Sequence, residues 1–386
     1  MSGSLRRALA LGAGLGAAGL ALPLGLELRL RRPDRPLTNA WRHVPVAPRG
    51  STRLGISFRP PQAEALGLDV RDALDTVLSY PFPLLRLGAY WNRIEPRPGA
   101  FEPAALDAQL DLAERAGKEV ILSVGALKTF SYPELYVPPH HLDPPLEEGT
   151  LVTPASHSSL LVAAMRFATR IVARYRDRPG IVAWQLEHEA VDPLGAEHSW
   201  RLASAFVEEE LAAVRSVDPT RPVLLNGFLP TSASVAVTQW WRTRDQGDSL
   251  AVAERIADIV GIDYYPRHAL LGLGGRTLYL DGRRLPWVRR RRRRLVASAR
   301  ASGQEVVVAE GQAEPWETVT TAPDPTGRAM YSCLPEDVIG NYNDCLGWGR
   351  DVLSAYLFWG AEYWVRRARS GDPSYLGAFA RVLEES

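Results

Sequence analysis

Short apolar runs rich in β-branched residues alternate with longer amphipathic stretches from Arg53 to the C-terminus. This alternation is typical of β/α units arranged around a parallel sheet. The clearest helical patterns cover residues 103–117, 157–180 and 199–219, and each ends at Gly or Pro before the next apolar run. The pattern predicts strands over residues 53–58, 83–91, 119–125, 181–189, 222–228, 258–266, 305–312 and 355–364.

Eight strands are the number that closes a (β/α)8 barrel. The competing fold is an open, doubly wound sheet, but no G-x-G-x-x-G sequence follows the first strand and the strand count fits closure better. We therefore expect an α/β protein with one TIM-barrel domain over residues 53–386. Two connections are longer than this fold requires, residues 126–154 and residues 311–341. Both follow the C-terminal end of a strand, where barrel enzymes place their active sites, so both are expected to line a cleft.

An almost uninterrupted apolar run over residues 8–26 follows two arginines. It is about long enough to cross a membrane as a helix, so residues 1–31 are expected to be a membrane anchor or a cleaved secretory signal. A buried helix of the main domain is the remaining alternative. Residues 32–52 are rich in Pro, Arg and Asn and are expected to form a linker. The sequence thus predicts an extracytoplasmic bacterial protein, either membrane-anchored or secreted.

The charges of the chain nearly cancel, because 45 Lys and Arg face 44 Asp and Glu. No overall field is available to hold a nucleic acid, and we expect no such partner. The most basic stretch, Arg289–Arg294, distributes around an outer helix before strand seven, where its side chains are expected to be solvated. Among charged partners, an anionic membrane or cell-wall polymer suits it better than a nucleic acid. Cys333 and Cys345 could close a disulfide in an exported chain or remain two free buried thiols.

Polar and aromatic side chains gather at the ends of the predicted strands. Carboxylates are rarely buried without a partner, so Glu189 and Glu310, each after an apolar run, need an ion-pair partner or a catalytic role. A structural ion network with Arg86 or Arg93 is the plain alternative, and Glu187 is expected to pair with a basic neighbour. Two carboxyls on opposite sides of the scissile bond are what glycoside hydrolysis needs. The strand-end residues are Arg86, Tyr90, Glu187, His188, Glu189, Asn226, Tyr264, Tyr265, Glu310 and Trp359.

The loop over residues 126–154 is dense in groups that could contact sugar rings, although some could equally pack the loop onto the barrel. They are Lys128, Phe130, Tyr132 and Tyr136. The same loop contains His140 and His141, with Glu134 nearby. An adjacent His pair does not present two ligands to one ion as an i, i+4 pair on a helix does, so no metal site is predicted.

Three segments resemble the clan of retaining glycoside hydrolases built on a (β/α)8 barrel, with its cellulase-like and β-galactosidase-like members. Residues 84–125 resemble the second and third units of these enzymes, WQLEHEAVDP (184–193) is similar to their W-Q-V-E-N-E segment, and VVVAEGQAEPW (306–316) is similar to their strand-seven nucleophile segment. The resemblance implies that Glu189, closing strand four, is the acid/base, and that Glu310, closing strand seven, is the nucleophile.

The resemblance also implies roles for the side chains around this pair. Arg86 would hydrogen-bond Glu310 and keep it ionised, and Tyr265 would contact the same carboxylate. The indole of Trp359, on strand eight, would lie under the sugar. One position departs from the family: His188 stands where an Asn contacts the sugar 2-hydroxyl, although a histidine ring nitrogen can also donate. Asn226, on strand five, could bind substrate or could only cap its strand. The candidate substrate-binding residues are Arg86, His188, Asn226, Tyr265, Trp359 and Lys128.

The expected function is retaining hydrolysis of a β-linked glycoside or polysaccharide by double displacement, with carboxyls about 5 to 5.5 Å apart. The presence of His188 motivates one alternative, a catalytically altered or inactive carbohydrate-binding barrel. The predicted anchor and the aromatic loop motivate another, a transglycosylase that remodels envelope polysaccharide. All three readings take a carbohydrate as partner, and double displacement needs no cofactor or metal.

Overall fold

The computed structural model describes most of the chain from Leu28 onward. Among the described residues, no helix is both long and apolar enough to span a bilayer. The apolar run over residues 8–26 lies outside the described part, as do Tyr132 and Trp316. The described residues are 28–31, 34–36, 38–131, 134–192, 200–273, 276–283, 285–315, 328–330, 332–349 and 351–386.

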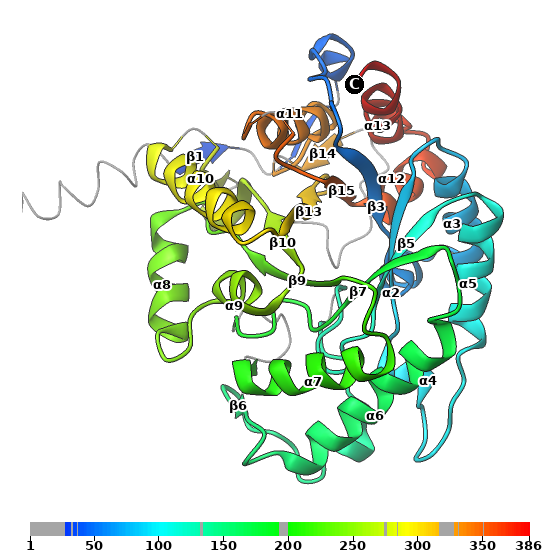
Figure 1. Ribbon diagram of the computed structural model, residues 1–386. Coiled ribbons are helices and arrows are strands. Elements are labelled where there is room, and N and C mark those ends of the chain that lie inside the picture. Colours follow the sequence, from blue (N-terminus) through cyan, green and yellow to red (C-terminus); the bar gives the residue numbers. More distant parts are fainter. Residues whose placement is uncertain are drawn as a thin grey trace, which may run out of the picture.

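Eight parallel strands close into a barrel in chain order, with the last strand pairing with the first, which confirms the predicted TIM barrel (Figure 1). Every strand predicted from the sequence corresponds to one strand of the barrel. The barrel strands are β3 (Arg53–Ser57), β4 (Leu84–Gly88), β5 (Glu119–Ser123), β7 (Ile181–Gln185), β9 (Val223–Phe228), β10 (Ile259–Tyr264), β13 (Glu305–Gln312) and β15 (Ala355–Trp359).

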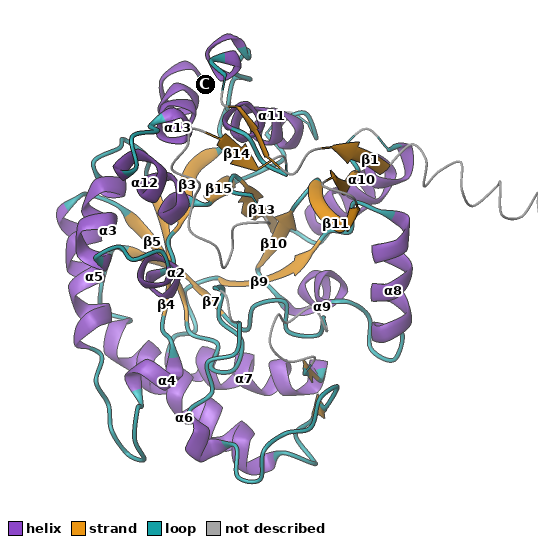
Figure 2. Ribbon diagram, turned by 180° about the vertical axis from the view of Figure 1, so that it is seen from behind, coloured by secondary structure: helices purple, strands orange, loops and turns teal. Residues whose placement is uncertain are grey.

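Helices surround the strands on the outside, as both ribbon views show (Figures 1 and 2). The three helices predicted most clearly correspond to α5, α6 and α7. The helices are α2 (Pro60–Ala65), α3 (Val70–Leu78), α4 (Trp91–Ile94), α5 (Ala104–Arg115), α6 (Ser158–Tyr175), α7 (Ser204–Val217), α8 (Ala233–Thr243), α9 (Ser249–Ile256), α10 (Pro286–Ala301), α11 (Pro335–Leu346), α12 (Ala361–Arg369) and α13 (Ser374–Glu385), with the 3-10 helices η1 (Ala40–His43) and η2 (Pro139–His141).

Two apolar cores hold the barrel. The larger one packs the helices against the outer faces of the strands. The smaller one is built from side chains among the first three residues of the strands, such as Leu84 of β4. Arg86 points to the same side of β4 as Leu84, because side chains alternate along a strand. The strands therefore begin apolar and end polar on the inside, which gathers their polar residues at the C-terminal mouth of the barrel.

Short strands outside the barrel form three small sheets among the described residues. β1 (Leu28–Arg31) joins the hairpin of β11 (Arg267–Leu273) and β12 (Arg276–Asp281) in a three-stranded sheet. β2 (Asp34–Pro36) pairs with β14 (Arg328–Met330), and β6 (Leu151–Val152) pairs with β8 (Arg201–Leu202).

The linker predicted over residues 32–52 is wrong for residues 38–52, which pack along the barrel. Trp41 is 9% exposed and belongs to the larger core. The backbone of Ala47 donates to Asn343 Oδ1 at 2.8 Å and accepts from the Tyr342 hydroxyl at 2.9 Å. One buried indole and backbone hydrogen bonds to α11 are enough to fix a segment whose composition is polar.

Three predicted strands are much too long. The strand predicted over residues 83–91 ends at Gly88, and α4 begins at Trp91. β7 ends at Gln185, because the Glu187 carboxylate turns to accept backbone N–H groups of Leu127, at 2.9 Å, and of Lys128. Glu187 therefore does not pair with a basic side chain as predicted. β15 ends at Trp359, where Gly360 adopts a φ of 142° that L side chains rarely adopt, and α12 begins.

The disulfide considered between Cys333 and Cys345 is not formed, and both thiols are free and buried. The basic run lies on α10 as predicted, but it is not wholly solvated. Arg292 is buried, donates to Asp344 Oδ2 at 2.9 Å, and places its guanidinium 4.8 Å from the ring centroid of Trp348.

Candidate active site

Glu310 lies near the end of β13 and is only 2% exposed. Arg86 Nη1 donates to its Oε1 at 2.9 Å, and the Tyr265 hydroxyl donates to its Oε2 at 2.5 Å. Burial raises the pKa of Glu310 above its ordinary value, whereas the charge of Arg86 and these two hydrogen bonds lower it. The carboxylate is thus held in one orientation by two donors, and one of them balances its charge.

Glu189 lies four residues beyond the end of β7, and its backbone is strained. Its φ of 43° is in the left-handed region, which costs a non-glycine residue about 1–3 kcal/mol. Lys128 Nζ donates to the Glu189 carbonyl at 2.7 Å and to the Asp192 carbonyl at 3.1 Å, so a buried cation stabilises this turn. Strain that is compensated in this way is typical of functional positions, because it fixes the direction of a side chain.

The surroundings of Glu189 favour its neutral form. Burial raises its pKa well above the ordinary value, and several neighbouring carboxyls raise it further. These are Asp263, Glu134, Asp192 and Glu310. Lys128 donates to the backbone carbonyl of Glu189, whereas Arg86 donates directly to the Glu310 carboxylate. The two carboxyls therefore differ in the way that an acid and a nucleophile must differ.

Hydrogen-bonded side chains from four barrel strands support the pair. Gln185 accepts from Arg86 Nε at 2.6 Å and donates to Asn226 Oδ1 at 3.0 Å. The amide of Asn226 in turn donates to Asp263 Oδ2 at 2.5 Å. Burial and the charge of Glu310 raise the pKa of Asp263 well above its ordinary value. The network links β4, β7, β9 and β10 beneath the two carboxyls.

His188 is held in one tautomer by the same amide. Asn226 Nδ2 lies 2.8 Å from His188 Nδ1, so the ring nitrogen accepts and Nε2 carries the proton. Burial and the cations Arg86 and Lys128 lower the pKa of His188 well below its ordinary value. Nδ1 also lies 3.5 Å from Glu310 Oε1. His188 is therefore a neutral ring between the acid/base candidate and the nucleophile candidate, with an N–H on Nε2.

An aromatic cluster of Phe130, Phe228, Tyr265 and Trp359 borders the carboxyls. The Arg59 guanidinium lies 4.0 Å from the ring centroid of Trp359 and forms buried ion pairs with Glu314, at 2.7 Å, and Glu362, at 2.5 Å. One face of the indole is therefore backed by a fixed cation. Phe130 similarly lies 3.8 Å from the Arg86 guanidinium, which restricts the arginine that contacts Glu310.

The structure brings most of the predicted site residues together. Lys128 is the exception: it is 1% exposed and its ammonium is bonded to two backbone carbonyls, with Glu134 at 3.7 Å. It holds Glu189 in place and is not available for direct contact with a sugar. Tyr264 faces away from the site, where its hydroxyl donates to Asp344.

Sequence reasoning missed Asp263, Gln185 and Arg59. Asp263 could have been found, because it ends an apolar strand, as Glu189 and Glu310 follow theirs. Gln185 and Arg59 carry no local signal, since their importance comes from residues that are distant along the chain.

Two groups in this site have ligand atoms close enough to hold a metal: Glu134, His188 and Glu189, and His188, Asp263 and Glu310. Other contacts compete with coordination there. His188 Nδ1 and Asp263 already accept hydrogen bonds from Asn226, and Arg86 is paired with Glu310. The fixed cation would repel a metal ion, so the arrangement favours acid–base chemistry by the side chains themselves.

Comparison with known proteins gives one partial family match. The family model described as β-galactosidase, glycoside hydrolase family 42, matches residues 82–208, which include Arg86 and Glu189. No curated protein matches the sequence.

Several solved structures share the fold. A GH5_18 protein from Streptomyces cattleya, in complex with GlcNAc, is 17% identical with a TM-score of 0.55, over 87% of this chain and 82% of that chain. Xylanase 10B from Thermotoga petrophila RKU-1, in complex with xylobiose, is 13% identical with a TM-score of 0.51, over 87% and 94%. A glycosylated endo-β-1,4-xylanase from Gloeophyllum trabeum is 16% identical with a TM-score of 0.50, over 86% and 96%.

The chain is therefore similar, in residues 82–208 and in its closed barrel, to glycosidases built on a (β/α)8 barrel, as the sequence resemblance predicts. At these identities the solved structures support the fold alone.

Proposed function

We propose that the protein is a retaining glycoside hydrolase that cleaves a β-linked glycoside or polysaccharide. The observation that supports this proposal best is the contrast between two buried carboxyls at the mouth of the barrel. Glu310 is hydrogen-bonded by a cation and a phenol, whereas Glu189 is surrounded by other carboxyls. Such a contrast assigns the ionised role to Glu310 and the protonated role to Glu189.

The reaction has two steps. Glu310 attacks the anomeric carbon while Glu189 donates its proton to the leaving glycosidic oxygen, giving a covalent glycosyl-enzyme and a free alcohol. Glu189, now ionised, takes a proton from water, and the water oxygen attacks the anomeric carbon and releases Glu310. Arg86 and Tyr265 hydrogen-bond the Glu310 carboxylate before it attacks, and again when it leaves the anomeric carbon in the second step.

His188 supplies the contact that the family makes through an amide. Its Nε2–H is free to donate to a sugar hydroxyl because Asn226 occupies Nδ1. A hydrogen bond to the 2-hydroxyl that strengthens in the transition state contributes several kcal/mol to this chemistry. The His188 imidazole thus keeps a hydrogen-bond donor at this position, although the ring differs in shape from the Asn side chain of the related enzymes.

The family match supports a proposal for the substrate class. The family model that matches residues 82–208 is described as β-galactosidase, an enzyme with a β-linked substrate. We propose a β-linked sugar for this chain, with Trp359 as the aromatic surface beneath it.

The stereochemistry of the first product tests the mechanism. Proton NMR of the full-length protein hydrolysing a panel of aryl β-glycosides should show the β-anomer of the released sugar first, followed by mutarotation. Initial release of the α-anomer would mean direct displacement by water and would contradict the role of Glu310 as nucleophile.

We also propose that the protein is exported and lies against a membrane. The apolar run over residues 8–26 supports this location. On the folded part, Trp240 and Trp241 of α8 are 63% and 59% exposed, and α10 carries the arginine run. Both helices lie on the side of the barrel that holds β1, the first described strand after the apolar run (Figures 1 and 2). Exposed tryptophans and arginines suit an anionic membrane surface.

A further inference from the structure

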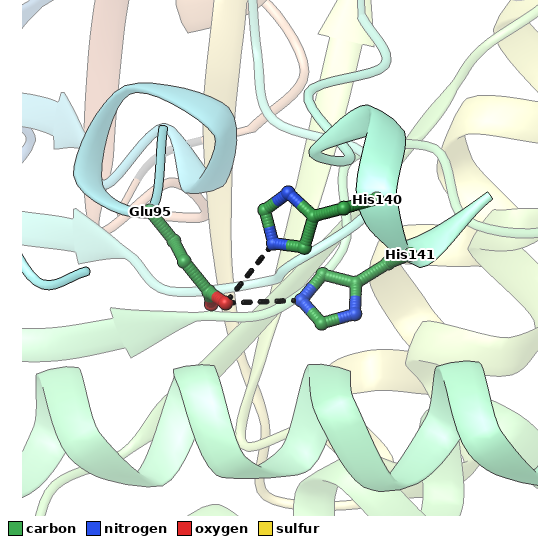
Figure 3. A group of neighbouring side chains, drawn as sticks. All are labelled: Glu95, His140 and His141. Atoms are coloured by element: carbon green, nitrogen blue, oxygen red, sulfur yellow. Dashed lines mark hydrogen bonds and ion pairs between the residues drawn. The ribbon is translucent and has the colours of Figure 1, made fainter. Parts of the chain in front are cut away.

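A second cluster of ligand-type side chains lies outside the proposed catalytic site. Glu95 follows α4 directly, and His140 and His141 belong to η2 in the loop after β5. Figure 3 shows both imidazoles turned toward the same carboxylate. The catalytic proposal uses none of these three residues.

The geometry of the cluster converges on one point. His140 Nε2 lies 3.2 Å and His141 Nε2 lies 3.1 Å from Glu95 Oε1 (Figure 3), and all three ligand atoms lie within 4.8 Å of one another. Ligand atoms around a tetrahedral zinc ion with bonds of about 2.0–2.1 Å are separated by about 3.3–3.4 Å. The two observed N···O separations are close to this value, and the two Nε2 atoms lie within 4.8 Å of each other, so small movements would bring three ligands to one ion.

Neighbouring groups hold the ligands in this arrangement. Trp91 Nε1 donates to Glu95 Oε2 at 2.8 Å, which leaves Oε1 directed at the imidazoles. The ring of His141 stacks on Trp91, with centroids 4.6 Å apart and planes 27° apart. Hydrogen bonds and packing of this kind orient metal ligands in proteins. The three side chains are 20–22% exposed, so an ion and a water molecule can reach them.

We propose that Glu95, His140 and His141 bind a divalent transition-metal ion, with Zn²⁺ as the best fit. Two imidazole nitrogens and one carboxylate oxygen are a ligand set that zinc accepts, with water in the fourth position. Calcium and magnesium prefer oxygen ligands and fit this set poorly. The sequence predicts no metal at this His pair, and the reason to propose one is that the short 3-10 turn directs both Nε2 atoms to Glu95.

The site would fasten a loop to the barrel. Residues 126–154 contain η2 and also Lys128, which holds Glu189. The loop is already linked to α4 by the hydrogen bond from Asn92 N to the Tyr136 carbonyl, at 2.8 Å. A metal ion between Glu95 and η2 would add a further link between the same two segments. Its role is therefore structural.

Metal binding by the full-length protein tests this proposal without an activity measurement. After treatment with a chelator, titration with ZnCl2 in a calorimeter should show one ion per chain. At a free zinc concentration about a hundred times Kd, the Tm should rise by about 4 °C.

Single substitutions locate the ion. Glu95→Gln and His140→Ala should each weaken zinc binding at least about 100-fold, because loss of a direct ligand costs more than loss of a supporting contact. The matched control is His43→Ala, which removes an exposed histidine far along the chain and should leave affinity and stoichiometry unchanged.

Two results would overturn the proposal. One is the absence of saturable zinc binding by the chelator-treated protein, with no change in Tm. The other is zinc binding that Glu95→Gln and His140→Ala leave as strong as in the unsubstituted protein. Both variants keep the stacking of His141 on Trp91, so they test ligation without removing that packing contact.

Discussion

Tyr264 and Tyr265 are neighbours in the chain with opposite surroundings. The Tyr265 hydroxyl donates to Glu310, whereas the Tyr264 hydroxyl donates to Asp344 on the outer side of the barrel. Alternation along the end of β10 produces this difference. The pair therefore offers a test in which the same chemical change is made on either side of one strand end.

We expect Tyr265→Phe to lower kcat/KM roughly 10- to 100-fold. This factor corresponds to the free energy that a hydrogen bond to a charged group usually contributes. The lost bond stabilises ionised Glu310, so its removal raises the pKa of the nucleophile. The acidic limb of the pH profile should then move to higher pH. Tyr264→Phe is the control and should leave the limb in place. Equal profiles for the two variants would argue against Glu310 as the ionised group.

His188 gives a second test at a single position. His188→Ala removes the Nε2 donor and should lower kcat about 100-fold or more with a smaller change in KM, because the contact strengthens in the transition state. His188→Asn restores the residue of the related enzymes and should keep most of the turnover. Steady-state kinetics of both variants check this, and an alanine variant with unchanged kcat would remove His188 from the mechanism.

The sequence singles out the two carboxyls but little of the network that supports them. Glu189 and Glu310 stand out because each follows an apolar run on a strand that the pattern predicts. The sequence suggests Lys128 as a substrate-binding residue, yet the structure bonds it to the backbone of Glu189. Contacts between residues 61 positions apart depend on the closed barrel, which local patterns do not contain.

Among the elements, barrel strands and long helices follow their hydrophobic periodicity and are predicted closely. Strand ends are not. β7 stops early because Glu187 accepts two backbone hydrogen bonds from the neighbouring loop, and β15 stops where Gly360 turns the chain into α12. Each end depends on a tertiary contact or on a backbone conformation, which periodicity does not report.

The segment over residues 38–52 contributes to stability through η1. We expect Trp41→Ala to lower the free energy of unfolding by about 3 kcal/mol, because it removes a buried indole that packs against Gly377 of α13. His43→Ala changes an exposed residue of the same turn and should stay within about 0.5 kcal/mol. Denaturant titration checks both variants. Equal free energies of unfolding for the two variants would mean that residues 38–52 are only loosely attached to the barrel.

The whole molecule presents the catalytic mouth and a second, exposed face formed by α8 and α10. We expect the full-length protein to bind vesicles that contain phosphatidylglycerol, and the double change Trp240→Ser and Trp241→Ser to weaken binding. Val162→Ser on α6 is the control, since Val162 is a 51% exposed apolar residue on another side of the barrel. Flotation of the vesicles measures the bound fraction. Equal flotation of the double variant would contradict the proposed orientation.

The central claim is that Glu310 forms a covalent bond to a sugar with the help of Glu189. Intact-mass analysis after incubation with a panel of 2-deoxy-2-fluoro β-glycosides tests it most directly, because the fluorine slows release of the glycosyl-enzyme. We predict one added sugar per chain, mapped by peptide analysis to Glu310 and absent from Glu310→Gln. An adduct on another residue, or turnover of the parent glycoside by Glu310→Gln at the original rate, would contradict the account.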